Sequence, residues 1–415
     1  MELKNHPASH LSYCSNLHPG SSWEEIREQL GRYLPELKKR LSPDAPFGVG
    51  LRLSAKAAYE LRKPGPLRDF QNWLKQEDLY VFTVNGFVHG HFHATRVKDE
   101  VYQPHWGEDD RLNFTRAIIE IMTELTPAGG ETSISTAPIS YKYWGFSDEE
   151  SNRIADQSAR NLAVLAYEMA RIEEEQQKLI HVDIEPEPDC YLETTDETID
   201  YFQNILLTTG SEFLQETYSV SEDRAREILL RHIQVCFDTC HVALEYEDPA
   251  ESIRKFREAG IGIGKVQISS ALKVSLPEDR SAISKELQQF DEPVYLHQVL
   301  ARTKYGAIQQ YRDLNDGLKE IGDRDQEEWR VHYHVPVFMD SYGTLSSTQD
   351  DTIRTLNECF GSSEKICNHF EVETYTWDVL PDGLKLELAD SVERELRWAL
   401  EQISRASDAS ESSQG

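Results

Sequence analysis

The chain has 415 residues, with 73 acidic and 43 basic side chains and a formal net charge of −30 at pH 7. A surface of that sign repels the phosphates of nucleic acids and of anionic lipids, so a nucleic-acid partner is not expected. The chain has no apolar run of about 18 residues and no apolar signal core near its start, so neither a membrane span nor a secretory signal is predicted. Its six cysteines form no C-x-x-C pair, which indicates reduced thiols in a cytoplasmic protein.

Eight apolar runs bounded by polar turns predict β-strands. In chain order they cover residues 11–17, 47–53, 79–87, 131–139, 179–184, 233–238, 264–269 and 370–377. Predicted strands and helices alternate, which favours a parallel sheet with helical crossovers. The number of repeats and the length of the chain suit an eight-stranded (β/α)8 TIM barrel with an insertion better than an open sheet.

Capping signals mark the starts of several helices between these strands. Ser22, Ser147 and Thr194 are each followed three residues later by glutamate, which is the spacing of a capping box. Asp248 precedes Pro249, so it offers an N-cap followed by proline at the first helical position. The predicted helices include residues 22–40, 111–125, 147–178 and 222–231.

The predicted organisation is a single barrel domain over residues 1–403. One extended run, V-H-Y-H-V-P-V-F at 331–338, is surplus to the eight strands. It is assigned to an insertion at about 273–369, between the seventh and eighth strands. Residues 404–415 are rich in serine and charged side chains, which predicts a disordered C-terminal tail.

Four predicted strands carry side chains suited to a metal ion. Glu185 follows the fifth strand, Asp238 ends the sixth, Gln267 lies on the seventh, and Glu373 lies on the eighth. The carboxyl ends of barrel strands meet at one face, and hard divalent cations prefer oxygen ligands. A single such residue is more often a solvated polar group, but four on successive strands predict a shared metal site. His241 follows Asp238 by three residues and would reach the same face.

The motifs V-D-I-E-P (182–186), D-T-C-H (238–241) and V-E-T-Y-T-W (372–377) resemble those of the xylose isomerase-like barrel superfamily. That group includes sugar-phosphate isomerases and epimerases and the endonuclease IV repair enzymes. More closely, the chain resembles the EboE family of metabolite-traffic proteins, a branch of the superfamily. The stretches that carry this closer resemblance are S-Y-C-S-N-L-H-P-G (12–20), T-V-N-G-F (83–87), V-Q-I-S-S-A-L (266–272), Y-L-H-Q-V (295–299), H-Y-H-V-P (332–336) and E-V-E-T-Y-T-W (371–377).

The resemblance implies that Glu185, Asp238 and Glu373 bind a divalent metal, namely Mn, Mg or Zn. It also implies that Glu185 and Glu373 exchange a proton with the substrate, and that His241 holds a substrate oxygen. The superfamily usually has histidine on the seventh strand where this chain has Gln267, and an amide oxygen is a weaker ligand than an imidazole.

Two histidines of the insertion could compensate for that departure. His332 and His334 alternate in H-Y-H, so they share one face of an extended chain. His334 is the candidate metal ligand and His332 the candidate for binding substrate. The alternative is that both belong to a polar barrel rim.

Further polar side chains near predicted strand ends are weaker candidates for binding substrate. His18 and Asn85 could bind hydroxyl groups, and Lys142 could bind a phosphate or carboxylate. A second alternating set could line the same face or belong to a solvated loop; it consists of His89, His91 and His93.

Three functions follow from these observations. The first is a metal-dependent sugar-phosphate isomerase or epimerase, acting in the biosynthesis or trafficking of a secondary-metabolite precursor. The second is a non-catalytic accessory protein that binds or transports a metabolite together with other proteins of the same metabolite-traffic pathway. The third is an endonuclease IV-like hydrolase, against which the net charge of −30 argues because a duplex-binding protein needs a basic surface.

Overall fold

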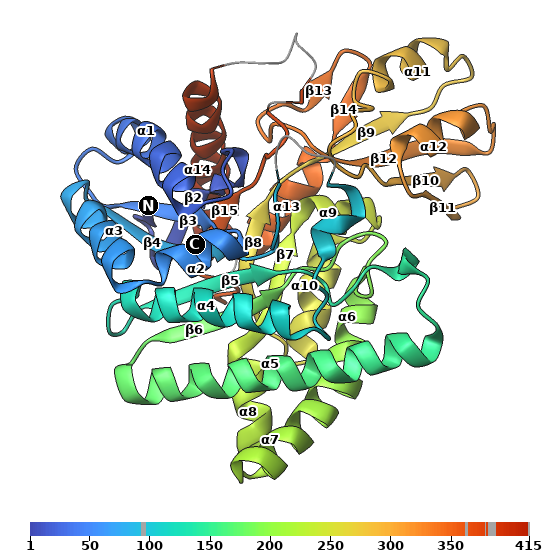
Figure 1. The fold of residues 1–415 in the computed structure, drawn as a ribbon. Coiled ribbons are helices and arrows are strands. Elements are labelled where there is room, and N and C mark those ends of the chain that lie inside the picture. Colours follow the sequence, from blue (N-terminus) through green and yellow to red (C-terminus); the bar gives the residue numbers. More distant parts are fainter. Residues whose placement is uncertain (93–96, 362–363, 378, 381–386, 414–415) are drawn as a thin grey trace.

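The computed structural model describes the whole chain except residues 93–96, 362–363, 378, 381–386 and 414–415 (Figure 1). A ring of eight parallel strands forms its centre, and the paired neighbours run from β3 round to β2. A parallel bridge between Cys14 and Gly50 brings the two ends of the ring together. The barrel predicted from the sequence is therefore confirmed. Its strands are β2 (His6–Tyr13), β3 (Phe47–Arg52), β4 (Leu79–Asn85), β5 (Glu131–Thr136), β6 (Leu179–Ile184), β7 (Ile233–Asp238), β8 (Ile263–Ile268) and β15 (His369–Val372).

Helices surround the ring, and the predicted caps form at their starts. Ser22 and Thr194 each make a complete capping box with the glutamate three residues on, while Ser147 and Asp248 cap α5 and α10. None of the helices in the described part of the chain is both long and apolar enough to cross a membrane. The helices are α1 (Trp23–Leu41), α2 (Ala55–Leu61), α3 (Pro64–Gln76), α4 (Asp109–Leu125), α5 (Asp148–Gln176), α6 (Thr195–Tyr201), the π-helix η4 (Phe202–Gly210), α7 (Ser211–Tyr218), α8 (Glu222–His232), α9 (Thr239–Leu244), α10 (Pro249–Glu258), α13 (Gln349–Phe360) and α14 (Leu388–Ser413).

An antiparallel sheet is inserted between β8 and α13, on one side of the barrel (Figure 1). It is shorter than the predicted 273–369, because α13 belongs to the helical layer and packs on α14 and α10. Its elements are β9 (Ala271–Ser275), α11 (Ser281–Leu287), β10 (Val299–Thr303), β11 (Ile308–Tyr311), α12 (Leu314–Glu320), β12 (Gln326–His334), β13 (Ser341–Tyr342) and β14 (Leu345–Ser347). The short elements outside this sheet are β1 (Glu2–Leu3), η1 (Ser15–Leu17), η2 (Lys98–Tyr102) and η3 (Lys142–Trp144).

Strand β12 connects the core of the insertion to the barrel. Trp329, Val331 and Tyr333 are fully buried in the hydrophobic core. Because side chains alternate along a strand, the intervening His332 and His334 face the other way. Both line the pocket at the carboxyl ends of the barrel strands.

The C-terminal segment differs from the predicted tail, since α14 continues to Ser413. Ile403 and Ala406 are buried, and the Ser407 hydroxyl lies 2.7 Å from Nε2 of His6. The serine-rich composition suggested disorder, but small and apolar residues at helical spacing keep one face of α14 against the barrel.

Gly50 on β3 faces a crowded barrel interior. A Cβ atom there would lie 1.7 Å from Oε1 of Glu371 and 2.5 Å from the Tyr13 carbonyl oxygen. Glu371 has little freedom to move, because it is fully buried and its Oε2 lies 2.5 Å from Nζ of Lys265.

Gly50→Ala is therefore expected to lower the free energy of unfolding by about 3 kcal/mol or more, as overpacking of a rigid core does. Gly65→Ala on α3 is the matched control, since nothing lies within 4 Å of a Cβ there. Urea unfolding of both variants checks the expectation. A Gly50→Ala variant as stable as Gly65→Ala would show that the barrel interior has room for a methyl group at Gly50.

Candidate metal centre

Glu185, Asp238 and Glu373 come together at the carboxyl ends of β6, β7 and β15. One oxygen from each lies within 4.8 Å of the others, and all three side chains are buried. Backbone hydrogen bonds fix the two glutamates at the strand ends: Glu185 N donates to Thr136 at 3.0 Å, and Glu373 N donates to Ile268 at 3.0 Å. We call these three residues, which the structure brings together, the carboxylate triad.

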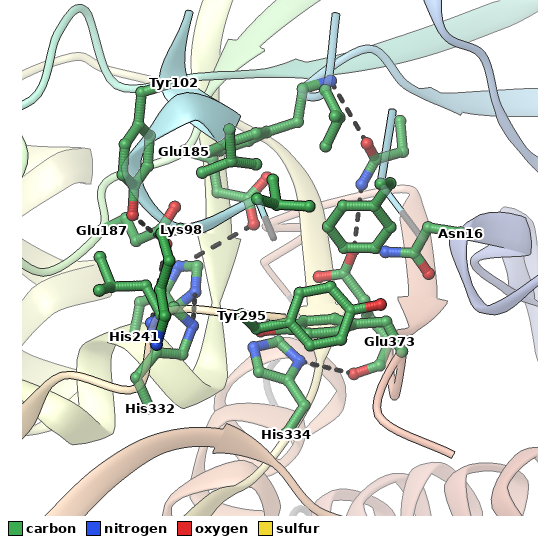
Figure 2. A pocket seen from close by; sticks show the side chains of 18 residues that line it. Asn16, Lys98, Tyr102, Glu185, Glu187, His241, Tyr295, His332, His334 and Glu373 are labelled. Atoms are coloured by element: carbon green, nitrogen blue, oxygen red, sulfur yellow. Dashed lines mark hydrogen bonds and ion pairs between the residues drawn. The ribbon is translucent and has the colours of Figure 1, made fainter. Parts of the chain in front are cut away.

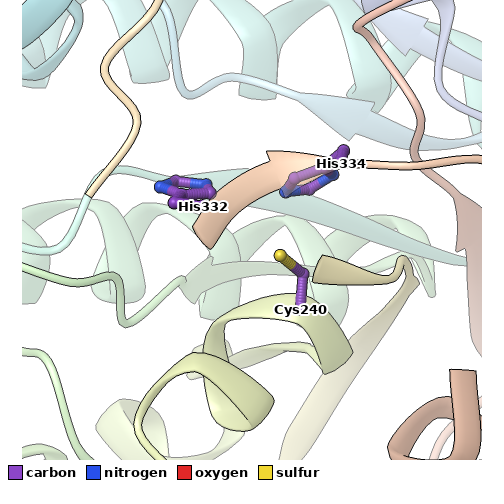
Figure 3. Close-up of side chains that lie close together, drawn as sticks. All are labelled: Cys240, His332 and His334. Carbon is purple, nitrogen blue, oxygen red and sulfur yellow. The ribbon is translucent and has the colours of Figure 1, made fainter. Parts of the chain in front are cut away.

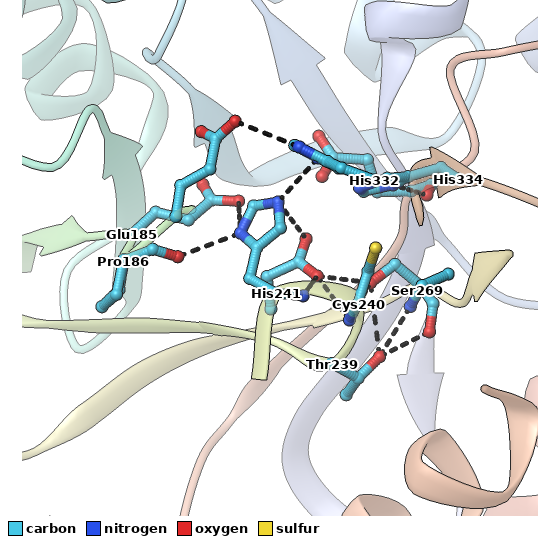
Figure 4. Close-up of polar contacts among 12 residues, drawn as sticks. Glu185, Pro186, Thr239, Cys240, His241, Ser269, His332 and His334 are labelled. Atoms are coloured by element: carbon cyan, nitrogen blue, oxygen red, sulfur yellow. Dashed lines mark hydrogen bonds and ion pairs between the residues drawn. The ribbon is translucent and has the colours of Figure 1, made fainter. Parts of the chain in front are cut away.

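Asp238 is both the last residue of β7 and the N-cap of α9. Its Oδ1 accepts hydrogen bonds from the Cys240 amide at 2.7 Å, the His241 amide at 3.2 Å and the Ser269 hydroxyl at 2.6 Å (Figure 4). Its Oδ2 is buried without a hydrogen-bond partner. The cap thus holds the carboxylate rigidly and leaves one oxygen for a ligand.

Two asparagines orient Glu373, which is one of the side chains that line the pocket (Figure 2). Nδ2 of Asn16 and Nδ2 of Asn85 both donate to Oε1 of Glu373, at 2.8 and 3.0 Å. Glu185 has a buried Oε2 without a hydrogen-bond partner. Unsatisfied buried carboxylate oxygens are costly unless a cation or a proton meets them, so this donor set fits a divalent ion.

The pKa values of all three triad carboxyl groups are shifted from their usual range. Burial, followed by repulsion from the other carboxylates, raises the pKa of Glu185 and of Glu373 well above the usual range. Burial also acts to raise the pKa of Asp238, but attraction to His241 and His334 outweighs it, and that pKa is lowered. The site therefore pairs one firmly ionised carboxylate with two that hold protons at higher pH.

His334 is oriented as metal-binding histidines usually are. Its Nδ1 donates to the Glu373 carbonyl oxygen at 2.8 Å, which leaves Nε2 as the nitrogen with a lone pair. That Nε2 is buried without a partner, and His334 lies with Asp238 and His241 in a set whose ligand atoms are within 4.8 Å of one another. Burial lowers the pKa of His334, so the ring is neutral.

His241 and His332 face each other with Nε2 atoms 3.2 Å apart (Figure 4). Their Nδ1 atoms donate to Pro186 O at 3.0 Å and to Gln298 Oε1 at 2.7 Å, so both Nε2 atoms present lone pairs. Two ligands at 2.0–2.1 Å from one tetrahedral ion are about 3.3 Å apart, so this pair also suits a cation. Burial lowers the pKa of His241 to about 4 and that of His332 well below the usual value.

Cys240 points toward the two histidines of the insertion, as Figure 3 shows. Its Sγ and one nitrogen from each of His332 and His334 lie within 4.8 Å of one another. Burial raises the pKa of the Cys240 thiol well above its usual value, so it is a neutral thiol in the absence of an ion. The centre thus offers carboxylate oxygen, imidazole nitrogen and thiol sulfur donors in overlapping sets.

Gln267 lies on β8 but does not join the triad. In the amide orientation that satisfies both groups, its nitrogen donates to Oε2 of Glu371 at 3.1 Å and to the Glu371 carbonyl at 3.3 Å. Glu371 precedes Glu373 by two residues on the same side of β15, one layer deeper in the barrel. The amide nitrogen of Gln267 is therefore engaged with Glu371, while the sheet places Gln267 in register with Asp238 on β7.

The structure also separates two of the predicted substrate-binding residues from the pocket. His18 is buried, with its Nε2 3.0 Å from the Tyr13 hydroxyl and its ring stacked on Tyr33. Lys142 on η3 forms ion pairs with Glu193 and with Glu197, the latter at 3.0 Å. Neither residue is among those that line the pocket, whereas Asn85 is.

His89 and His91 of the loop after β4 are not among the residues that line the pocket. The His89 ring packs against Phe114, and Nδ1 of His91 lies 2.6 Å from the Ser21 hydroxyl. His93 falls outside the described residues.

Sequence reasoning missed Asn16 and Glu187, which also line the pocket. Oε1 of Glu187 accepts a hydrogen bond from the Tyr102 hydroxyl at 2.6 Å, and burial raises its pKa to about 8. The E-P-E-P run was the available signal, because its second glutamate follows Glu185 by two residues.

The pocket encloses about 580 Å³, including the open solvent at its entrance. The triad members Glu185 and Glu373 and the three histidines form its polar side (Figure 2). Aromatic and aliphatic side chains form the other side; they are Phe87, Val88, Phe92, Val97, Val101, Tyr102, Tyr295, Leu296 and Tyr375.

Glu395 of α14 supports the segment that carries Glu373. Its Oε1 accepts hydrogen bonds from the Thr374 hydroxyl at 2.6 Å and the Val337 amide at 3.2 Å. Burial raises the pKa of Glu395 to about 8. The folded chain therefore keeps a proton that the unfolded chain releases near pH 4.5, so this group destabilises the fold progressively as pH rises from about 4.5 to 8.

Glu395→Gln is expected to remove that part of the pH dependence. Relative to the parent chain, the variant should gain a few kcal/mol in the free energy of unfolding between pH 5 and pH 8. Denaturant unfolding at both pH values measures the change, with the exposed Glu401→Gln on the same helix as control. A parallel offset at both pH values would show that Glu395 is already ionised at pH 5.

Comparison with known proteins supports the fold. No protein-family model matches the chain, and no curated protein matches it. A xylose isomerase-like TIM-barrel protein from Mycobacterium smegmatis, solved in complex with magnesium, aligns with a TM-score of 0.51 and 9% identity over 96% of this chain and 98% of its own. A D-tagatose 3-epimerase-like protein aligns at TM-score 0.48 and 12% identity over 95% and 98%, and the IolI protein with a bound zinc atom at 0.45 and 14% over 96% and 99%. The fold of this chain is that of a xylose isomerase-like TIM barrel.

Proposed function

We propose that the chain is a divalent-metal-dependent isomerase or epimerase acting on a small metabolite. The observation that carries the proposal is the carboxylate triad, whose oxygens lie within 4.8 Å of one another. His334 adds a neutral imidazole that presents its Nε2, which takes the place of the weaker Gln267. The mixture of oxygen and nitrogen donors suits Mn²⁺ or Zn²⁺ better than Mg²⁺.

The acid and base of the reaction would be Glu185 and Glu373. A divalent ion in the site would polarise a carbonyl or hydroxyl oxygen of the substrate. The Glu185 carboxylate would take the proton from the carbon next to the carbonyl, and the C–H electron pair would move toward the carbonyl oxygen. Glu373 in its acid form would return a proton to carbon, with Asn16 and Asn85 holding its Oε1. The raised pKa values of both glutamates suit proton transfer near neutral pH.

We further propose that the substrate is a precursor of a secondary metabolite and that the chain works with other proteins of the same metabolite-traffic pathway. The motif resemblance to the EboE family supports this role. A second candidate is a non-catalytic metabolite-binding protein. It is favoured by the glutamine at the usual strand position, whose amide nitrogen donates to Glu371.

Metal content and hydrogen exchange separate the two candidates. Purified chain would be stripped, reloaded with Mn²⁺, and incubated in D₂O with a panel of ketoses and sugar phosphates. Deuterium appearing at a substrate carbon, and lost in Glu185→Gln, supports the enzyme. Bound metal with no exchange on any panel member supports the binding protein, and absence of metal binding removes the metal-dependent enzyme.

A further inference from the structure

We propose that the ligand of this pocket is an uncharged, hydroxyl-bearing molecule with an apolar, ring-sized substituent, and not a sugar phosphate. The inference rests on the proposed function, since the metal-binding side of the pocket would recognise the hydroxylated end. It adds the substrate class, which departs from the phosphate predicted from the sequence.

Three aromatic rings make up an apolar wall next to the metal centre. Phe92, Tyr295 and Tyr375 lie with ring centroids 5.1–5.4 Å apart. They come from three distant segments: the loop after β4, the insertion and the segment after β15. The Tyr375 ring lies 4.7 Å from the His334 ring, so the wall begins where the metal ligands end. We call these three residues the aromatic wall.

The wall belongs to a hydrophobic cluster that is separate from the main core. That cluster contains Phe87, Val88, Phe92, Tyr102 and Tyr295, and Leu296 and Tyr375 pack against it. Backbone hydrogen bonds from Val97 and Lys98 to the Val294 carbonyl, at 2.9 and 3.2 Å, join the β4 loop to the insertion above the pocket. Enclosed apolar surface of this kind contributes affinity only to a ligand that has an apolar part to bury.

A phosphate group would find no available cation among the described residues that line the pocket. Lys98 is the lysine of that lining, and its Nζ lies 2.5 Å from Oδ2 of Asp313. Lys142, the predicted phosphate ligand, lies outside the lining and is paired with two glutamates.

The buried arginines nearest this loop are also engaged. Arg52 donates to the Gly20 carbonyl at 2.6 Å and to the Gly90 carbonyl of this loop at 3.4 Å, and Arg111 donates to the Phe87 carbonyl at 2.6 Å. Both guanidinium groups therefore stabilise the loop backbone rather than the pocket.

The charge around the metal centre also disfavours an anion. The triad and Glu187 place four buried carboxyl groups around the site. A divalent ion bound by the three ionised carboxylates of the triad leaves no surplus positive charge for a phosphate dianion, whereas hydroxyl groups can donate to carboxylate oxygens without a charge cost.

Matched glycosides test the inference directly. The Mn²⁺-loaded full-length chain would be titrated calorimetrically with phenyl and methyl β-D-glycosides of glucose, galactose and mannose, and with the 6-phosphates of the same sugars. At least one phenyl glycoside should bind about tenfold more tightly than its methyl partner, and no sugar phosphate should bind. Binding of a sugar phosphate, or no phenyl preference in any pair, including no binding at all, overturns the inference.

Two variants show whether the aromatic wall causes the preference. Phe92→Ala should remove the tenfold advantage of the phenyl glycoside while leaving the Mn²⁺ stoichiometry unchanged; an advantage that survives contradicts the assignment. Ile308→Ala, on the exposed face of β11, is the control that should keep it. Loss of Mn²⁺ binding by the parent chain would instead refute the proposed function, so the two failures are distinguishable.

Discussion

His334→Ala is expected to bind Mn²⁺ or Zn²⁺ at least about 100-fold more weakly than the parent chain, because a ligand is lost outright and even the loss of an outer hydrogen-bond partner costs 10–100-fold. The expectation follows from the fixed tautomer: Nδ1 donates to the Glu373 carbonyl, so Nε2 presents its lone pair beside Asp238 and His241.

Gln267→Leu is the matched comparison, because it shows whether β8 or the insertion supplies the metal ligand. If the seventh strand supplied the ligand, as the superfamily pattern implies, this variant would lose the metal. We expect its metal affinity to stay within about tenfold of the parent value, because the Gln267 amide is engaged with Glu371. Competition with a chelator of known affinity measures both variants. A larger loss of metal affinity in Gln267→Leu than in His334→Ala would place the ion deeper in the barrel.

Glu373→Gln is expected to slow substrate deuterium exchange by about 10³-fold, within the range that a general acid–base group contributes. A glutamine at this position keeps the shape of the side chain and an oxygen for Asn16 and Asn85, but it cannot accept and return a proton. Bound Mn²⁺ is quantified in the same sample. Slow exchange with unchanged Mn²⁺ content indicates a lost proton donor, whereas a reduced Mn²⁺ content indicates a lost metal ligand.

Asn85→Ala provides a graded control for Glu373. It removes one of the two donors to Oε1 and leaves the carboxyl group in place, so exchange should fall by about tenfold or less. Exchange in Glu373→Gln equal to that of the parent chain would transfer the acid–base role to Glu187, whose pKa is raised to about 8 by burial.

The barrel was predictable because its strands carry a strong local signal. The runs L-I-H-V-D-I (179–184) and I-Q-V-C-F-D (233–238) place apolar side chains at every second position or closer, and the structure places β6 and β7 at these residues. The capping boxes at Ser22 and Thr194 are equally local, since a hydroxyl and a glutamate three residues apart are sufficient to form them.

The contacts of the site depended on tertiary structure that sequence spacing does not encode. The H-Y-H spacing predicted that His332 and His334 share a face. It did not predict that Gln298 orients the His332 ring, that the Glu373 carbonyl orients the His334 ring, or that Pro186 orients the His241 ring that faces them. Gln267 lies at the expected strand position, yet its partner Glu371 is distant in sequence.

At the C-terminus, composition predicted less order than the structure has. The serine-rich composition of residues 404–415 predicted disorder, whereas α14 continues to Ser413 and buries Ala406.

The most direct test is a crystal structure of the Mn²⁺-soaked protein with data collected at the manganese absorption edge. We expect an anomalous peak about 2.0–2.3 Å from oxygens of Glu185, Asp238 and Glu373 and from Nε2 of His334. A soaked crystal without an anomalous peak among these four side chains would contradict the metal centre on which the proposed function depends.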